Sequence, residues 1–142
     1  MIRQALILVG GLGTRLGKLT ALNPKPMLLV AERPFVEYLV TNLKRHGINK
    51  IVFSTGYCSD KVMNFFGDGS SYGIDISYVV ELNPLGTGGA ILNAKEYLDS
   101  EFFVINGDSL FDINYAKLVG LLSSDLNALI AIALRETEDV SR

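Results

Sequence analysis

The sequence predicts a three-layer α/β/α fold, in which helices cover both faces of a mainly parallel sheet. Apolar runs of strand length alternate with helix-like segments along the whole chain, a pattern typical of parallel strands joined by crossover helices. The chain has 142 residues, of which 49% are hydrophobic and 20% are charged. This length and composition are typical of one compact globular domain with a real core.

The first elements show the signals of this fold most clearly. Residues 5–9 form a short apolar run that ends at glycines, which indicates a strand buried on both faces. Residues 34–46 predict a helix, because Pro34 suits a first helical position, apolar residues recur every four positions, and Gly47 suits the end. Residues 50–55 form a second apolar strand.

The later elements repeat the alternation. Residues 59–66 predict a helix, with a serine or an aspartate as its cap and a glycine after its end. A loop rich in glycine and serine follows. The remaining elements are expected as strands over 74–80, 102–105 and 127–134, and as helices over 87–98 and 115–122.

Composition excludes several classes of function. The net charge of −2 gives no basic surface for a nucleic acid. One cysteine and one histidine exclude an internal disulfide framework, a cysteine-based zinc site and a two-histidine metal site. The apolar run near the N-terminus is too short to span a bilayer and lacks a signal-peptide cleavage pattern. We therefore expect a cytoplasmic protein without nucleic-acid or membrane partners, and leave a homo-oligomer open.

The loops that directly follow strands are the expected ligand site, because a parallel sheet binds ligands outside the carboxyl ends of its strands. The first such loop, in "LILVGGLGTRLGKLTALNPKPM", contains Gly10, Gly11 and Gly13, whose backbone N–H groups can approach a phosphate. The dinucleotide fingerprint fails because its third glycine is Leu16, and the P-loop pattern fails at two required positions. What remains is G-G-x-G-T-R-L followed by P-K-P.

Three motifs in this order resemble the sugar-1-phosphate nucleotidyltransferase family. They are the glycine loop with P-K-P, "NPLGTGGA" at 83–90 and "VINGDSLFD" at 104–112, and the resemblance covers essentially the whole chain. It implies a Rossmann-like, GT-A-like fold and transfer of a nucleotidyl group from a nucleoside triphosphate to a sugar 1-phosphate, giving an NDP-sugar and pyrophosphate. The D-glycero-α-D-manno-heptose 1-phosphate guanylyltransferases are the most similar subfamily, followed by the mannose-1-phosphate guanylyltransferases. Family members are longer, so residues 1–142 are expected to be the nucleotide-binding part, without the sugar-binding part.

Two cations are predicted to be catalytic, because both reactants are anions that must be neutralised and aligned. Arg15 ends the glycine loop, and its planar guanidinium can bind triphosphate oxygens on the leaving side. Lys25 lies between two prolines, of which the second favours an extended backbone at Lys25 and so a stiff base for the side chain. A solvated surface position is the alternative for each.

Asp108 is the predicted metal ligand and the third catalytic residue. It follows a buried strand, and a carboxylate there can bind Mg²⁺, which prefers oxygen ligands and substrate phosphates. An Asx turn or a helix cap is the alternative.

The base-binding loop begins at Glu81, at the end of the third strand. A carboxylate can accept from the two adjacent donors of guanine, whereas thymine or uracil would suit an amide, so Glu81 favours GTP. A glutamate that simply faces water, thymidylyl or uridylyl specificity, and a non-catalytic nucleotide-sensing subunit remain alternatives. The predicted nucleotide site comprises Gly10, Gly11, Gly13, Thr14, Glu81, Pro84, Gly86 and Thr87.

Overall fold

The computed structural model describes residues 2–11, 23–56, 59–125, 127–134 and 136. Two units make up the chain, one spanning residues 2–110 and the other formed mainly by residues 111–142. Arg15, Gly13 and Thr14, which the sequence assigns to the phosphate site, lie outside the described residues. No helix of the described part is long and apolar enough to cross a membrane.

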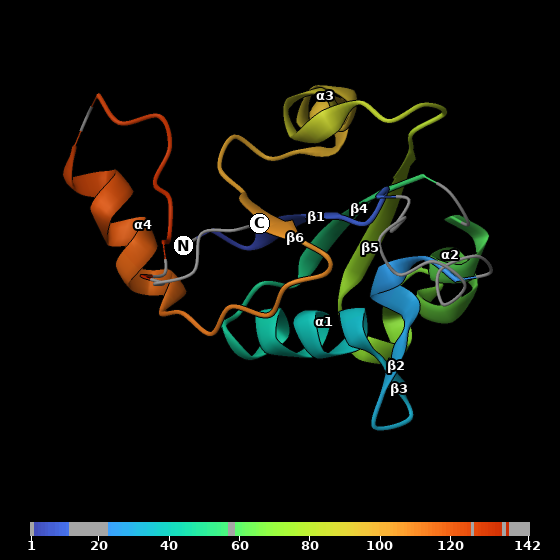
Figure 1. Cartoon of the computed structure of the whole chain (residues 1–142). Helices are drawn as coiled ribbons and strands as arrows, with labels where there is room; N and C mark the ends of the chain where they lie inside the picture. The colour runs from blue at the N-terminus through green and yellow to red at the C-terminus, as the bar shows by residue number, and fades with distance from the viewer. Residues whose placement is uncertain (1, 12–22, 57–58, 126, 135, 137–142) are drawn as a thin grey trace. The chain divides into compact units, whose positions relative to one another are not determined.

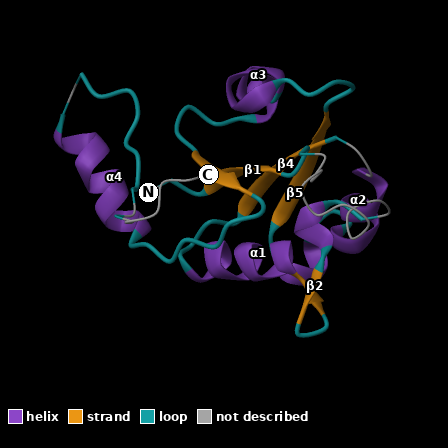
Figure 2. Cartoon of the chain, viewed as in Figure 1, coloured by secondary structure: helices purple, strands orange, loops and turns teal. Residues whose placement is uncertain are grey.

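A four-stranded parallel sheet forms the centre of the 2–110 unit (Figure 2). Its strands lie in the spatial order β5-β4-β1-β6. Its central strand β1 is fully buried at Ala5, Leu6 and Ile7, as a strand covered on both faces requires. The four strands are β1 (Gln4–Leu8), β4 (Lys50–Thr55), β5 (Asp75–Val80) and β6 (Phe103–Asn106).

Helices cover both faces of this sheet. The helices α1 (Phe35–Arg45) and α2 (Ser59–Phe66) lie on one face, and α3 (Gly86–Asn93) lies on the other (Figure 1). The strands β1, β4 and β5 are added in this order toward one edge of the sheet. After β5 the chain crosses back, and β6 pairs in parallel with the other side of β1. This arrangement confirms the predicted three-layer α/β/α fold with a mainly parallel sheet.

Smaller elements connect these layers. A two-stranded antiparallel hairpin of β2 (Leu29–Val30) and β3 (Arg33–Pro34) precedes α1. The 3₁₀ turns are η2 (Lys25–Met27), η3 (Ser70–Tyr72) and η4 (Lys95–Tyr97). In the second unit, α4 (Tyr115–Ser124) is capped by Asn114, whose side chain accepts a hydrogen bond from the backbone N–H of Lys117.

The C-terminal segment differs from the prediction. The expected strand over 127–134 is wrong, because none of these residues has strand structure. The apolar, β-branched composition of the segment favours a strand, but a strand forms only beside a pairing partner. Its large apolar side chains are instead exposed, at 72–92% of their surface, for Leu129, Ile130, Ile132 and Leu134.

The helix expected over 87–98 is also shorter than predicted. It ends at Asn93, and the chain continues as η4. The buried side chain of Gln4 accepts from the backbone N–H of Asp99 at 2.6 Å and donates to the carbonyl oxygen of Tyr97 at 2.8 Å. Because these bonds tie the chain after α3 to β1, a continuous helix would leave the buried amide of Gln4 without its partners.

Candidate functional site

A pocket of about 460 Å³ lies in the 2–110 unit, where β1, β5 and β6 end. This is the edge at which a parallel sheet binds ligands. The predicted site residues that line the pocket are Gly10, Gly11, Lys25, Glu81, Pro84, Gly86, Thr87 and Asp108. The sequence analysis missed the lining residues Leu8, Val9, Pro26, Ala90 and Asn106. For Leu8, Val9 and Asn106, a position at the end of a strand was the sequence feature that indicated a place in the pocket lining.

Lys25 and Asp108 meet in this pocket although 83 positions of sequence separate them. The Lys25 Nζ donates to Asp108 Oδ2 at 2.7 Å, and both side chains keep about two fifths of their surface exposed, at 42% and 40%. The structure therefore brings together the predicted phosphate-binding cation and the predicted metal ligand.

The backbone at Lys25 is turned, so the expectation of an extended conformation there is wrong. Lys25 begins η2, in which Met27 N donates to the carbonyl oxygen of Pro24 at 2.8 Å and Leu28 N donates to that of Lys25 at 3.1 Å. Pro26 is buried within this turn, where its missing N–H costs no hydrogen bond. The two hydrogen bonds and the buried proline still give Lys25 a rigid base.

Asp108 is positioned by the glycine before it. Gly107 N donates to the carbonyl oxygen of Leu8 at 2.9 Å, which fixes the loop after β6 on β1. A Cβ atom at Gly107 would lie 2.5 Å from Val9 Cγ1 and 2.8 Å from the Leu8 carbonyl oxygen. Because any side chain would displace this loop, the glycine of the N-G-D motif serves the position of the carboxylate.

The ion pair also sets the charge of Asp108. The hydrogen bond from Lys25, together with the positive charge of Lys25 and the hydroxyl of Ser109, lowers the pKa of the Asp108 carboxyl below its ordinary value. Asp108 is therefore a carboxylate at neutral pH and can bind a cation.

Glu81 is held by donors on both of its oxygens. Ser54 Oγ donates to Glu81 Oε1 at 2.6 Å, and the backbone N–H of Leu85 donates to Oε2 at 3.2 Å. The backbone N–H of Glu81 donates to the Thr55 carbonyl oxygen at 2.7 Å. A Cβ atom at Gly10 would lie 3.2 Å from Glu81 Oε1, so the glycine loop passes close to this carboxylate.

Comparison with known proteins identifies the family. Residues 4–142 match the family model described as Nucleotidyl transferase. The chain belongs to the nucleotidyl transferase family. The family resemblance and the GT-A-like fold expected from the sequence are thereby confirmed.

Relatives of this nucleotidyl transferase chain include two curated guanylyltransferases. It is 39% identical over 140 residues to D-glycero-alpha-D-manno-heptose 1-phosphate guanylyltransferase of Campylobacter jejuni, across 98% of this chain and 60% of that protein. It is 43% identical over 117 residues to mannose-1-phosphate guanylyltransferase of Mycobacterium tuberculosis, across 82% of this chain and 33% of that protein. The chain thus spans about 60% of the length of the heptose relative that it matches.

A solved structure shows the same fold. The crystal structure of HddC from Yersinia pseudotuberculosis complexed with GMP-PN has a TM-score of 0.76 and 35% identity to this nucleotidyl transferase chain. The match covers 89% of this chain and 55% of that one.

The donor set for a metal in this nucleotidyl transferase is small. The described residues contain no group of three or more histidine, cysteine, aspartate or glutamate side chains that could hold a metal ion. Mg²⁺ is commonly bound by one or two carboxylates, with substrate phosphates and waters as its other ligands. Asp108, partly exposed in the pocket, fits this shared mode. The described residues do not supply a metal cage of protein side chains alone.

Proposed function

We propose that this chain is the nucleotide-binding part of an enzyme that transfers GMP from GTP to a sugar 1-phosphate, with release of pyrophosphate. The 2.7 Å contact between Lys25 and Asp108, in the pocket that Glu81 and the glycine loop also line, carries this proposal. A cation, a cation-binding carboxylate and an acceptor for a base therefore share one ligand pocket. The sugar-binding part is proposed to lie outside residues 1–142.

The proposed reaction is a direct displacement at the α-phosphorus of GTP. An oxygen of the sugar phosphate forms the new P–O bond, the bond to the bridging β-phosphate oxygen breaks, and pyrophosphate leaves with the electron pair. Positioning and neutralisation of charge are sufficient for this chemistry, because no covalent intermediate is required. Lys25 is proposed to neutralise the incoming phosphate, and Arg15, whose role rests on the glycine-loop motif, the leaving pyrophosphate.

Asp108 is proposed to hold the Mg²⁺ that accompanies the triphosphate. Bound Mg²⁺ screens the negative charge on the phosphate oxygens. Because Lys25 now occupies Asp108 Oδ2, binding requires this ion pair to open or rearrange. Opening costs little, since exposed ion pairs of this kind contribute roughly 0–1 kcal/mol.

Guanine is the base that we propose. Glu81 lines the pocket and offers carboxylate oxygens, which match the adjacent N1–H and amino group of guanine. The guanylyltransferase names of the two relatives agree with this choice. Thymidylyl or uridylyl specificity is less well supported, because those bases present one N–H between two carbonyl groups. We further propose a cytoplasmic location, on the grounds of the proposed triphosphate substrate.

A pyrophosphate-release assay tests the proposal. GTP, Mg²⁺ and a panel of sugar 1-phosphates are incubated with this chain and with a longer form that contains the proposed sugar-binding part. We expect release to depend on GTP and one sugar 1-phosphate in the longer form, and to fall at least about 100-fold in Lys25→Met, as loss of a preorganised charge requires.

The matched control is Lys50→Met, which removes a similarly exposed ion pair outside the pocket lining. Lys50 lies 3.4 Å from Asp99, with exposures of 49% and 47%. Wild-type rates in Lys25→Met would contradict its catalytic role. GTP binding without pyrophosphate release in the longer form would favour the nucleotide-sensing alternative.

A further inference from the structure

Ser54 is a buried polar residue of β4 that directly follows the apolar run of residues 51–53. It is fully buried, in register with Leu8 of β1 and Val79 of β5, and only Thr55 separates it from the end of the strand. A buried hydroxyl needs a partner, because burial without a hydrogen bond is costly. The partner of Ser54 is a side chain of the ligand pocket, Glu81, and not a backbone group of the sheet.

Among the described residues, one hydrogen-bond donor contacts each carboxylate oxygen of Glu81. Ser54 Oγ donates to Oε1 at 2.6 Å, and the backbone N–H of Leu85 donates to Oε2 at 3.2 Å. An ionised carboxylate has about four lone-pair sites, two on each oxygen. Each oxygen therefore has an acceptor site that no described residue fills, and the two sites together can accept from two adjacent donors.

Orientation of this carboxylate depends on the two protein donors. The terminal torsion of a glutamate is broad, so without donors its two oxygens have no preferred plane. Leu85 N alone would hold one oxygen at the longer of the two distances, and Ser54 holds the other at the shorter one. Removal of the Ser54 hydroxyl should thus keep the negative charge of the Glu81 carboxylate but allow the carboxylate plane to rotate.

We propose that Ser54 is a specificity-determining positioning residue, which orients Glu81 so that both carboxylate oxygens accept hydrogen bonds from the guanine edge. The proposal rests on the proposed function, because it assumes that this pocket binds GTP. Its consequence is discrimination by the second donor of the base. Guanine presents N1–H and an amino group, whereas hypoxanthine, the base of ITP, presents N1–H alone. GTP and ITP therefore differ by the hydrogen bond from the amino group to the second oxygen of Glu81, which depends on the orientation of the carboxylate.

The experiment compares the dissociation constants of GTP and ITP, each with Mg²⁺, for wild type and Ser54→Ala of the 142-residue chain. We expect wild type to prefer GTP, and Ser54→Ala to weaken GTP binding about 10-fold and ITP binding no more than about 3-fold, as the loss of one hydrogen bond to a charged group implies. The ratio of the two constants should therefore fall.

Thr55→Val is the matched control. Thr55 is the next residue of β4, is also buried, and its hydroxyl donates to the backbone carbonyl oxygen of Val79 at 3.3 Å. The valine substitution removes a buried hydroxyl at nearly constant volume, and we expect it to leave the GTP:ITP ratio unchanged. Ser54→Cys, which keeps the size of the side chain but has a weak donor, should lower the ratio as Ser54→Ala does.

A double substitution separates positioning from a general structural effect. In a Glu81→Gln background, Ser54→Ala should change the GTP:ITP ratio less than about 2-fold, because the carboxylate that Ser54 orients is absent. An effect as large as in wild type would overturn the proposal. Equal weakening of GTP and ITP in Ser54→Ala, or an unchanged ratio in both Ser54→Ala and Ser54→Cys, would overturn it as well.

The failure of this inference is distinguishable from the failure of the proposed function. If wild type prefers GTP and the Ser54 variants keep that preference, only the role of Ser54 is refuted. If wild type binds no nucleoside triphosphate, or binds dTTP best, the proposed function is refuted and the role of Ser54 with it.

Discussion

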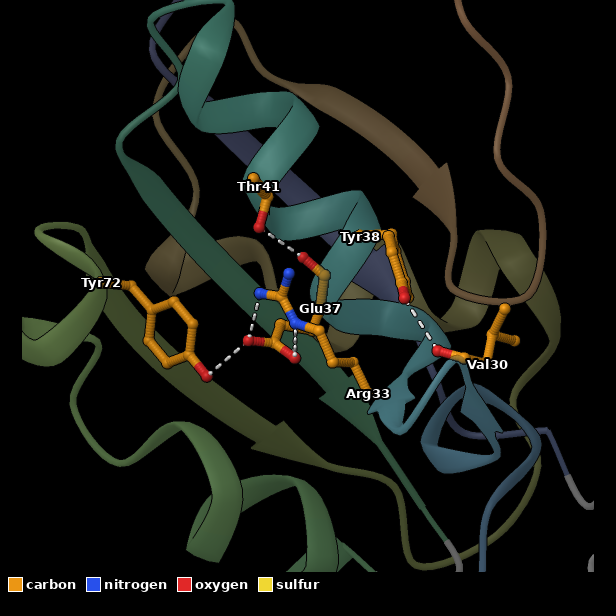
Figure 3. Close-up of polar contacts among 6 residues, drawn as sticks. All are labelled: Val30, Arg33, Glu37, Tyr38, Thr41 and Tyr72. Carbon is orange, nitrogen blue, oxygen red and sulfur yellow. Dashed lines mark hydrogen bonds and ion pairs between the residues drawn. The ribbon is translucent and has the colours of Figure 1, made fainter.

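Replacing Glu37 with glutamine should destabilise the 2–110 unit by about 2 kcal/mol, the range expected for a hydrogen bond to a charged group. Glu37 lies on α1, and its side chain is only 9% exposed. Its carboxylate accepts from Arg33 Nε at 3.0 Å, from Arg33 Nη2 at 2.7 Å and from the Tyr72 hydroxyl at 3.2 Å (Figure 3). The carboxylate thus links β3, α1 and η3.

The magnitude follows from what glutamine keeps. A glutamine amide retains one acceptor oxygen for Arg33, and its NH₂ group can donate to the Tyr72 oxygen, so one of the two guanidinium bonds is lost. Arg33 is 52% exposed, so water can satisfy the N–H group that is released. The loss is therefore close to one charge-assisted hydrogen bond, without the larger penalty of a buried orphan donor.

The pH dependence has a definite sign. The hydrogen bond from Arg33 is the largest cause that lowers the pKa of the Glu37 carboxyl below its ordinary value of 4.5. A lowered pKa in the folded state contributes stability that is complete above the ordinary value and is lost as the pH falls through the folded value. The difference between wild type and Glu37→Gln should therefore persist at neutral pH and shrink below pH 4.5.

Urea unfolding of both proteins at pH 7, 5 and 4 measures this difference. Tyr72→Phe is the control, because it removes only the 3.2 Å bond to the Glu37 carboxylate and should cost about 1.5 kcal/mol at neutral pH, the lower end of the range for a hydrogen bond to a charged group. A Glu37→Gln protein within about 0.5 kcal/mol of wild type at pH 7 would refute the reasoning, since surface substitutions alone give such values. A difference that does not shrink in acid would refute the assigned charge.

Three further predictions concern other parts of the 2–110 unit. Ala31 and Glu32 form the hairpin turn with φ of 47° and 67°, so Glu32→Gly should raise the free energy of unfolding by about 1 kcal/mol, measured in urea; no gain would contradict strain at the turn. Gln4→Leu should cost about 2 kcal/mol in the same assay, because two backbone groups lose their partner; a neutral effect would show that water replaces the amide. Lys25→Met and Asp108→Asn should each change the free energy of unfolding by less than about 1 kcal/mol. In a titration, Asp108→Asn should abolish GTP binding with Mg²⁺, whereas Lys25→Met should keep it, because Lys25 is proposed to act on the incoming sugar phosphate. Large destabilisation would assign the pair a structural role.

The sequence predicted an element well where the residues that determine it lie in or directly beside that element. The strand over 50–55 and the helix over 59–66 were predicted with the bounds of β4 and α2. An apolar run marks the strand, and a cap with a glycine directly after the end marks the helix, so both signals are local. The strand over 127–134 was predicted from the same kind of signal and is wrong, because strand formation depends on a partner that sequence pattern does not locate.

The candidate site shows the same division. Lys25 and Asp108 were each predicted from the segment that contains them. Asp108 follows β6 at the ligand edge of the sheet, whereas Lys25 lies in η2, so the rule on strand ends did not predict their contact. Ser54 was not found, because a serine near the end of a strand forms no motif. Its importance depends on the pairing of β4 with β5, which brings its hydroxyl to Glu81. The role of Arg15 stays a prediction, because that residue lies outside the described part of the chain.

A titration of this chain with nucleotides in the presence of Mg²⁺ tests the central claim, that the pocket at the ends of β1, β5 and β6 binds a guanine nucleoside triphosphate. The panel is GTP, dTTP, UTP, CTP and ATP, with NADH as the representative of dinucleotide-binding proteins. We expect saturable binding that is tightest for GTP and is lost in Asp108→Asn. Tight binding of NADH without binding of any triphosphate would contradict the account.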